Sequence, residues 1–453
     1  MHRLDLTADE LILRFLELSK SEQVCILDSC GVGHLGSHLM IAGVRPSEVY
    51  EITNDDPTET LVFLDEKLSG EKAAIFTLSY GLGPKLEKIK SKHKPTSEPD
   101  VFLALFDALI VHDYDNGVTR LIGDEATFPS IEELIRSVTV TGVTNATKVT
   151  NVTGETISSN FTKPAYLEAI GDIKERIRRG DTYQTNLTQQ LTVRLSPDTS
   201  PQSIFHNLRR DNPAPFAAFI QRKDSTVISA SPERFFRVEG YTITTSPIKG
   251  TSPRGKNATE DEALKRALLS SEKDIAENTM IVDLLRNDLG RVCEYGSVRV
   301  EKLCDLEEHP TLFHLVSTIS GRLRTDTNFS EILRALFPCG SITGAPKIST
   351  MRIIDELEPD ARGLSMGAIG VRIQGPRSKV QSPISAHSSF IPHPSSLDLS
   401  VAIRTMVIRD GQAAFNVGGG IVIDSDPEAE YDESLLKAKA LLEATGLKNS
   451  PPG

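Results

Sequence analysis

The spacing of apolar residues predicts several amphipathic helices. Between Tyr166 and Ile177 apolar side chains recur every three or four residues, and Gly180 follows as a C-cap. The same spacing predicts further helices over residues 271–287, 330–337, 346–357 and 427–445. Ser425 or Asp426 is the expected N-cap of the last helix. The first 18 residues fit a short strand or an amphipathic helix, and their acidic residues are not typical of a signal peptide.

Alternating and β-branched runs predict strands between these helices. Clear examples are residues 226–229, 235–238, 298–303 and 313–319. Strict alternation from Leu399 to Val407 predicts one strand, with Arg404 on the face that carries Ala402 and Met406. Residues 415–417 and 421–423 are predicted as two strands separated by a glycine break. Many hairpin-connected strands with helices inserted between them favour an α+β fold over an alternating one.

Two segments interrupt these patterns. Residues 138–162 are polar and rich in Thr and Asn, which predicts a linker or surface loop. We therefore divide the chain into an N-terminal section, 1–155, and a second section, 156–453. Residues 374–396 are rich in Pro, Ser and His and fall between two strand-like runs, which predicts a long hairpin insertion.

Composition restricts the class of protein. The 453 residues are 39% hydrophobic and 25% charged, as in globular proteins. The net charge of −12 argues against nucleic acid as a partner, because phosphate binding requires a basic surface. No apolar stretch approaches the roughly 18 residues of a membrane span. The five cysteines form no CxxC pair, which argues against a disulfide framework or a zinc site and favours a cytoplasmic protein.

The pentapeptide Pro247-Ile248-Lys249-Gly250-Thr251 is the first candidate for chemistry. It places a lysine between a strand-like run and a Gly-Thr turn. Burial of a lysine favours the neutral amine, which is a nucleophile. An isolated lysine in a loop more often has no chemical role, so this interpretation depends on the residues that follow.

Two pairs of acidic residues are candidate metal ligands. Asp274 and Glu277 share one helical face, as do Glu430 and Glu433, and Lys437 follows Glu433 by four residues. Each pair alone is typical of a solvated helix surface. Together the two pairs would supply oxygen ligands to one hard cation such as Mg²⁺, provided that the two helices meet.

Three further features fit the binding of an anionic substrate. The glycines at 418–420 allow an anion to approach the backbone, although a strand bulge explains them equally well. Arg404 offers a bidentate fork for a carboxylate, or a cross-strand salt bridge. Glu233 is a candidate general acid if it is desolvated, or it pairs with a cation such as Arg234.

These motifs, in this order, resemble those of the chorismate-utilising enzymes. That family includes anthranilate synthase component I, aminodeoxychorismate synthase component I, isochorismate synthase and salicylate synthase. The matching stretches are GDTYQTNL (180–187), SPERF (231–235), PIKGT (247–251), DIAENTMIVDLLRNDLGRV (274–292), HLVSTISG (314–321), FPCGSITGAPK (337–347), AIRT (402–405) and NVGGGIVIDSDPEAEYDESLLKAKA (416–440). The resemblance implies two large antiparallel sheets packed as a sandwich with helices outside, and both sections interleaved in one globular unit.

The resemblance also implies roles for individual residues. It implies Mg²⁺ bound by Glu277 and Glu433, with Asp274 and Glu430 close by. It places Lys249 and Glu233 as the catalytic nucleophile and general acid. Chorismate would be held by Gly250, Thr251, His314, Ser341, Ser365, Arg404, Gly418, Gly419, Gly420 and Lys437. In relatives, Ser29, Pro215 and Phe216 match an effector pocket for tryptophan, but we do not expect regulation here.

Two positions distinguish the branches of the family. Water-adding members carry a lysine base where this chain has Gln184, and anthranilate synthases resemble PIAGT where this chain has PIKGT. The lysine in PIKGT resembles aminodeoxychorismate synthases, in which it is thought to form a covalent intermediate. The resemblance further implies that a separate glutamine amidotransferase subunit supplies ammonia. Two alternatives remain open, namely an anthranilate synthase component I and a non-catalytic chorismate-binding subunit.

Overall fold

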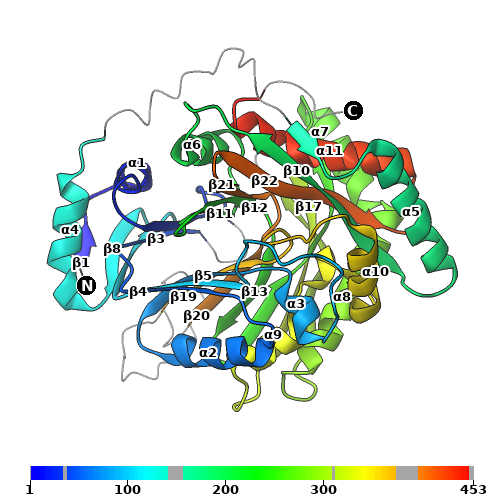
Figure 1. Ribbon diagram of the computed structural model, residues 1–453, viewed down its shortest axis with the longest axis horizontal. Helices are drawn as coiled ribbons and strands as arrows, with labels where there is room; N and C mark the ends of the chain where they lie inside the picture. Colours follow the sequence, from blue (N-terminus) through cyan, green and yellow to red (C-terminus); the bar gives the residue numbers. More distant parts are fainter. Residues whose placement is uncertain (1, 34–37, 141–156, 309–311, 374–395, 448–453) are drawn as a thin grey trace.

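The computed structural model describes residues 2–33, 38–140, 157–308, 312–373 and 396–447. Most of the 138–162 linker and nearly all of the 374–396 insertion lie outside the described residues. The rest forms two large sheets with helices on the outside (Figure 1). All strand pairs in both sheets are antiparallel. The predicted α+β sandwich of two large antiparallel sheets with helices outside is confirmed.

The first sheet has 12 strands among the described residues. Their order is β1 (His2–Leu4), β8 (Val118–Gly123), β7 (Ala108–Asp113), β3 (Leu39–Val44), β2 (Val24–Asp28), β11 (Phe216–Gln221), β12 (Thr226–Ser231), β21 (Thr405–Arg409), β22 (Gln412–Ile421), β10 (Gln184–Arg194) and β18 (Gly344–Ala345), with β9 (Ile157–Ser159) also paired to β10.

The second sheet has 10 strands in the same part of the chain. Their order is β15 (Ile248–Pro253), β17 (Leu312–Arg322), β14 (Thr242–Ser246), β13 (Arg234–Glu239), β20 (Ser396–Val401), β19 (Ala368–Ile373), β5 (Ala73–Leu78), β6 (Val101–Phe106) and β4 (Glu48–Ile52), with β16 (Arg299–Glu308) also paired to β17. Both sheets thus take strands from residues 1–155 and from residues 156–453.

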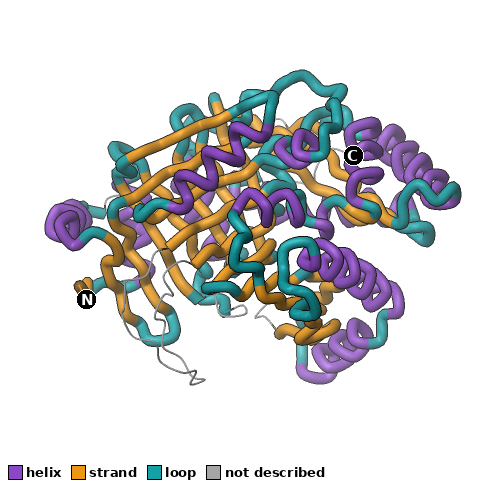
Figure 2. The backbone as a smooth tube through the Cα atoms, turned by 90° about the horizontal axis from the view of Figure 1, so that it is seen from below, coloured by secondary structure: helices purple, strands orange, loops and turns teal. Residues whose placement is uncertain are grey.

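The helices cover the outer faces of the two sheets, and the strands cross the middle of the molecule (Figure 2). They are α1 (Ala8–Leu18), α2 (Pro57–Ser69), α3 (Leu82–Leu86), α4 (Phe128–Ser137), α5 (Lys163–Arg178), α6 (Pro201–Asp211), α7 (Ala258–Leu269), α8 (Glu272–Gly290), α9 (Phe329–Leu336), α10 (Lys347–Leu357) and α11 (Pro427–Ala444), with short 3-10 turns η1 (Glu125–Thr127) and η3 (Gly340–Ile342). The N-cap of α11 is Asp426, whose side chain accepts a hydrogen bond from the amide of Ala429. The N-terminal residues form both a strand and an amphipathic helix.

Alternation along the strands divides the core into layers. In β2, Ile26 belongs to the apolar cluster beneath α1 and α6, whereas Cys25 belongs to the cluster between the two sheets. In β11, Phe219 and Ile220 divide in the same way. A third cluster lies between the second sheet and the helices α2, α3, α8 and α9. The result is a four-layer α/β/β/α arrangement, since each strand buries both of its faces.

The stretch 399–407 is not one strand, as its alternation predicted. The chain leaves the second sheet at the end of β20 and enters the first sheet at β21. Arg404 lies in the connection and has a positive φ of 48°. A residue in this left-handed conformation interrupts the pleat, so Arg404 does not share a strand face with Ala402 and Met406. It marks the point where the chain crosses between the sheets.

The predicted break at residues 418–420 is also wrong, because β22 continues through all three glycines. A Cβ atom on Gly418 would lie 1.9 Å from the carbonyl oxygen of Leu187. A Cβ atom on Gly420 would lie 1.9 Å from Nε2 of Gln184. The glycines are therefore explained by close packing against β10.

Within the described part of the chain, no helix is both long enough and apolar enough to cross a bilayer.

We predict that Leu399→Ala destabilises the fold strongly. Leu399 is fully buried in the cluster between the second sheet and its helices. Removal of its side chain leaves a cavity, so the free energy of unfolding should fall by about 2–5 kcal/mol. Chemical denaturation measures this change. Leu436→Ala is the control, because Leu436 is 68% exposed, and an equal loss in both variants would contradict the assigned core.

Candidate active site

Lys249 lies in strand β15, and the Gly-Thr pair that was predicted as a turn after it belongs to the same strand. The pairing of β15 with β17 shifts register between Ile248 and Thr251, and Gly250 at this bulge has a φ of +85°. Nζ of Lys249 donates a hydrogen bond to the carbonyl oxygen of Ser341 at 3.2 Å. The bulge therefore turns the amine toward the 3-10 turn η3 and holds it against that backbone.

Glu233 is buried beside this lysine. It sits between β12 and β13 and is only 5% exposed. Burial raises the pKa of Glu233, opposed by a hydrogen bond from Ser341 and by the charge of Lys249. Its Oε1 has no hydrogen-bond partner among the described residues. Arg234, the alternative partner of Glu233, pairs with Asp398 instead. The protonated form of Glu233 is thus favoured more than in an ordinary glutamate, which suits a general acid.

The two acidic helix faces meet, which the sequence alone did not establish. Nζ of Lys273 on α8 lies 3.7 Å from a carboxylate oxygen of Glu430 on α11. Burial raises the pKa of Glu277, and the charges of Asp274 and Glu430 raise it further, against the lowering effect of Lys249 and Lys273. All of these groups therefore act on one small region.

Glu433 carries its charge more readily than Glu277. Burial raises the pKa of Glu433, but Lys437, Lys273 and Lys249 together lower it below the ordinary value. Nζ of Lys437 lies 2.8 Å from Glu433 and donates to the carbonyl oxygen of Gly418 at 3.0 Å. Lys249 thus acts electrostatically on Glu233, Glu277 and Glu433.

The acidic groups suit a hard cation. The described residues contain no group of three or more His, Cys, Asp or Glu side chains arranged to hold a metal ion. Mg²⁺ does not need such a group, since it commonly takes one or two carboxylates together with waters and an anionic ligand. Glu277 and Glu433 offer oxygen atoms of this kind. The mutual repulsion that raises the pKa of Glu277 is also relieved by a divalent cation.

Arg404 lies beside the corner that carries Glu233. Its carbonyl oxygen accepts a hydrogen bond from the amide of Ala230 at 3.0 Å, and Val401 donates to the carbonyl oxygen of Glu233 at 3.0 Å. Burial lowers the pKa of the Arg404 guanidinium, and no described residue forms a hydrogen bond or ion pair with it. The predicted alternative of a cross-strand salt bridge is therefore not seen in the described structure. A largely buried guanidinium of this kind is suited to an anionic ligand.

Other predicted residues surround the same region. Oγ1 of Thr251 lies 2.9 Å from Nδ1 of His314. A Cβ atom on Gly419 would lie 3.2 Å from Glu430 and 3.5 Å from Lys437, so this glycine borders the second acidic face. Gln184 is buried, and its Oε1 has no partner in the described structure.

Two predictions concern residues in other cavities. Ser365 accepts a hydrogen bond from the amide of Asn416 and lines a cavity of about 770 Å³ with Gln190 and Arg409. No contact in the described structure joins it to Lys249 or Glu233. Ser29, Pro215 and Phe216 do come together, in a cavity of about 70 Å³ that Lys249 does not line.

Two groups at this site were not predicted from the sequence. Lys273 connects the two acidic helices, and its position next to Asp274 was the available signal. Cys339 places its thiol 3.2 Å from the hydroxyl of Ser341. No spacing rule identifies a cysteine of this kind before the fold is known.

Comparison with known proteins places this arrangement in a family. The model of the chorismate binding enzyme family matches residues 23–375 and 389–443. The chain belongs to the family of chorismate-binding enzymes. The predicted resemblance is thereby confirmed.

Individual relatives are similar over most of their length. The chain is 36% identical to aminodeoxychorismate synthase component 1 of Bacillus subtilis, over 83% of this chain and 77% of that protein. It is 35% identical to anthranilate synthase component 1 of Aquifex aeolicus, over 79% of this chain and 71% of that protein. The crystal structure of anthranilate synthase component I from Streptococcus pneumoniae superposes with a TM-score of 0.73 at 27% identity, covering 90% of this chain and 93% of that one. Overall identity therefore does not separate the two activities.

We predict a pH-dependent effect of Glu233→Gln on stability. Burial raises the folded-state pKa of Glu233, so the folded protein retains a proton that the unfolded chain releases above its ordinary value of about 4.5. Wild-type stability should therefore fall as pH rises from about 4.5 through the folded-state pKa, by up to about 1.4 kcal/mol per pH unit. Glu233→Gln lacks this loss, so the variant should gain stability relative to wild type as pH increases.

Denaturation at a series of pH values measures this difference. Glu443→Gln is the control, because the Glu443 side chain is 52% exposed. A stability difference between Glu233→Gln and wild type that does not change with pH would show that Glu233 is charged throughout.

Proposed function

We propose that this protein is an aminodeoxychorismate synthase component I, which converts chorismate and ammonia to 4-amino-4-deoxychorismate and water. The observation that carries the proposal is the position of Lys249. Its amine lies against Ser341 and acts on the buried Glu233. A nucleophile and a general acid thus stand together in a chorismate-binding enzyme. The similarity to aminodeoxychorismate synthase component 1 of Bacillus subtilis supports the same choice.

In the proposed first step, neutral Lys249 attacks C2 of the ring. Both ring double bonds shift, and the C4–O bond breaks. Glu233 donates its proton to the departing hydroxyl, which leaves as water, and the extra proton of the new secondary amine returns to Glu233. Two successive allylic displacements thereby replace one difficult substitution.

In the second step, ammonia adds at C4 while the C2–N bond to Lys249 breaks. Both double bonds return to their first positions. The amine of Lys249 recovers one proton, and the newly bound ammonia loses one. No group is oxidised or reduced, and the enzyme returns to its starting state.

The binding residues are proposed to hold the two carboxylates of chorismate. Arg404 supplies a fork without a carboxylate partner in the described structure, and Lys437 lies at the glycine strand. We propose that Glu277 and Glu433 hold Mg²⁺, with Asp274 and Glu430 beside them. When bound, the ion neutralises substrate charge and orients the anionic ring.

Ammonia is proposed to come from a glutamine amidotransferase that acts as a partner. The name "component 1" that these relatives carry supports a two-component enzyme. Anthranilate synthase component I is the second candidate function, because the relative from Aquifex aeolicus is almost as similar. Lys249 favours the first candidate, since release of pyruvate from chorismate does not require an amine nucleophile.

We predict that purified protein with chorismate, Mg²⁺ and ammonium forms aminodeoxychorismate, and that Lys249→Ala lowers kcat by at least about 10³-fold. Mass spectrometry identifies the product. In the absence of ammonium, intact wild-type protein should also gain the mass of one chorismate minus one water. Lys256→Ala is the control, because Lys256 is an exposed residue seven positions along the chain.

Each outcome of this experiment has a separate meaning. Formation of anthranilate and pyruvate by the wild type would establish the second candidate function. Undiminished turnover by Lys249→Ala would exclude the covalent step while leaving the product assignment intact.

We predict that Glu277→Gln weakens Mg²⁺ binding in the presence of chorismate by about tenfold or more, because it removes one charged oxygen ligand. Calorimetric titration with Mg²⁺ measures the change. Glu272→Gln is the matched control on the same helix, since Glu272 is exposed. Equal affinities in the two variants would remove Glu277 from the proposed metal site.

A further inference from the structure

The short turn formed by residues 339–343 contacts both proposed catalytic groups. The carbonyl oxygen of Ser341 accepts the hydrogen bond from Lys249, and its hydroxyl interacts with Glu233. The position of this one residue therefore fixes the amine and the carboxyl group relative to each other. A shift of the turn moves both hydrogen bonds at once.

The internal hydrogen bonds of the turn are few. Oγ1 of Thr343 donates to the carbonyl oxygen of Cys339 at 2.7 Å. The two backbone hydrogen bonds within the turn are long, at 3.4 Å from Ile342 to Cys339 and 3.3 Å from Thr343 to Gly340. The turn therefore depends on neighbouring elements for its position.

Arg362 supplies such a support from outside the turn. Its Nη1 donates to the carbonyl oxygen of Ile342 at 3.0 Å, directly after Ser341. Its Nη2 donates to the carbonyl oxygen of Asn186 in β10 at 2.6 Å. The guanidinium lies 4.6 Å from the ring centroid of Tyr80. One rigid side chain thus joins the turn to a strand of the first sheet.

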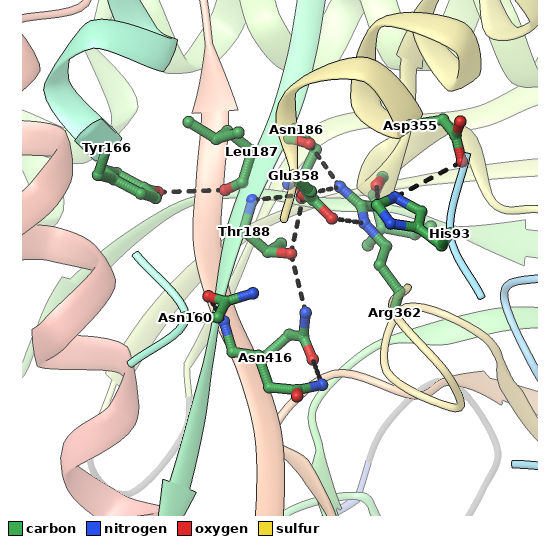
Figure 3. A network of polar contacts seen from close by, with 12 residues as sticks. His93, Asn160, Tyr166, Asn186, Leu187, Thr188, Asp355, Glu358, Arg362 and Asn416 are labelled. Atoms are coloured by element: carbon green, nitrogen blue, oxygen red, sulfur yellow. Dashed lines mark hydrogen bonds and ion pairs between the residues drawn. The ribbon is translucent and has the colours of Figure 1, made fainter. Parts of the chain in front are cut away.

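Glu358 holds the guanidinium from the opposite side (Figure 3). It accepts from Nε of Arg362 at 2.9 Å and from Nη2 at 2.8 Å, and both side chains are 1% exposed. Oε1 of Glu358 also accepts from the amide of Thr188 at 2.7 Å and from its hydroxyl at 2.9 Å. Glu358 and Arg362 are therefore both hydrogen-bonded to β10, through Thr188 and Asn186, and Nη1 of Arg362 donates to the turn.

We propose that Arg362, held by Glu358, is a positioning residue that fixes the 339–343 turn and, through Ser341, aligns Lys249 with Glu233. A buried ion pair is weak evidence for a role in stability, because apolar residues of similar volume often serve as well. What apolar residues cannot supply is a directed hydrogen bond to the Ile342 carbonyl. The inference rests on the proposed function, since it concerns the alignment of its catalytic groups.

The test uses Arg362→Lys in the full-length protein. Lysine keeps the charge next to Glu358, but a point charge cannot reach Glu358, Asn186 and Ile342 together as the planar fork does. The expected result is a fall in kcat of about 10²-fold, with KM for chorismate within about threefold of wild type, because misplacement affects reaction more than binding. Glu358→Gln keeps one acceptor for Arg362 and should give a smaller loss.

Arg222→Lys is the matched control. Arg222 forms an ion pair with Glu98, with side chains 1% and 8% exposed, and donates to Thr77. No contact joins it to the 339–343 turn in the described structure. Its variant should lose a similar amount of thermal stability and keep kcat. Equal losses of kcat in the two variants would overturn the proposal.

Hydrogen exchange gives a readout that does not depend on turnover. Amides in residues 339–345 should exchange about tenfold faster in Arg362→Lys than in wild type, and should be unchanged in Arg222→Lys. If Arg362→Lys does not fold, Glu358→Gln takes its place in both measurements. Unchanged exchange in this segment would overturn the positioning role. A wild type without activity on chorismate would refute the proposed function and leave the exchange result valid.

Discussion

The amine of Lys249 and the acids around it form the interaction on which the site depends. One positive charge acts on Glu233, Glu277 and Glu433, which come from three separate parts of the chain. Removal of the lysine would leave the buried Glu233 and the two other carboxyl groups with less compensation, and removal of the acids would leave the amine with fewer counter-charges. The proposed nucleophile is therefore also a group that lowers the pKa of the acids around it.

The fold brings these groups together by crossing between the sheets. The chain passes from β12 to β13 at Glu233 and from β20 to β21 at Arg404, so both corners connect the two sheets. Hydrogen bonds from Val401 to Glu233 and from Ala230 to Arg404 hold the corners side by side. At such a corner the chain is not paired on both sides as it is within a sheet, so its polar groups are available for function. The two sheets hold these corners rigidly in place.

The helices that the sequence predicted are present, because their apolar period and caps are local features. The prediction failed where packing between distant segments decides the structure. The alternation from Leu399 to Val407 reads as one strand, yet the positive φ of Arg404 divides it between two sheets. The glycines at 418–420 read as a break, yet the approach of β10 makes them part of a strand. The role of Arg362 was not predicted, because an i,i+4 pair with Glu358 is ordinary and its contacts with the turn and with β10 are to carbonyl groups of distant residues.

The net charge of −12 raises the question of how the protein holds an anionic substrate. Individual cations at the site bear on this question more than the net charge does. The guanidinium of Arg404 has no carboxylate partner among the described residues, and Lys249 donates to a neutral carbonyl group rather than to an acid. Burial strengthens the field of the Arg404 guanidinium, because the surrounding protein screens charge less than water does. We therefore expect affinity for an anion to depend on the local charge of Arg404, and not on the net charge of the protein.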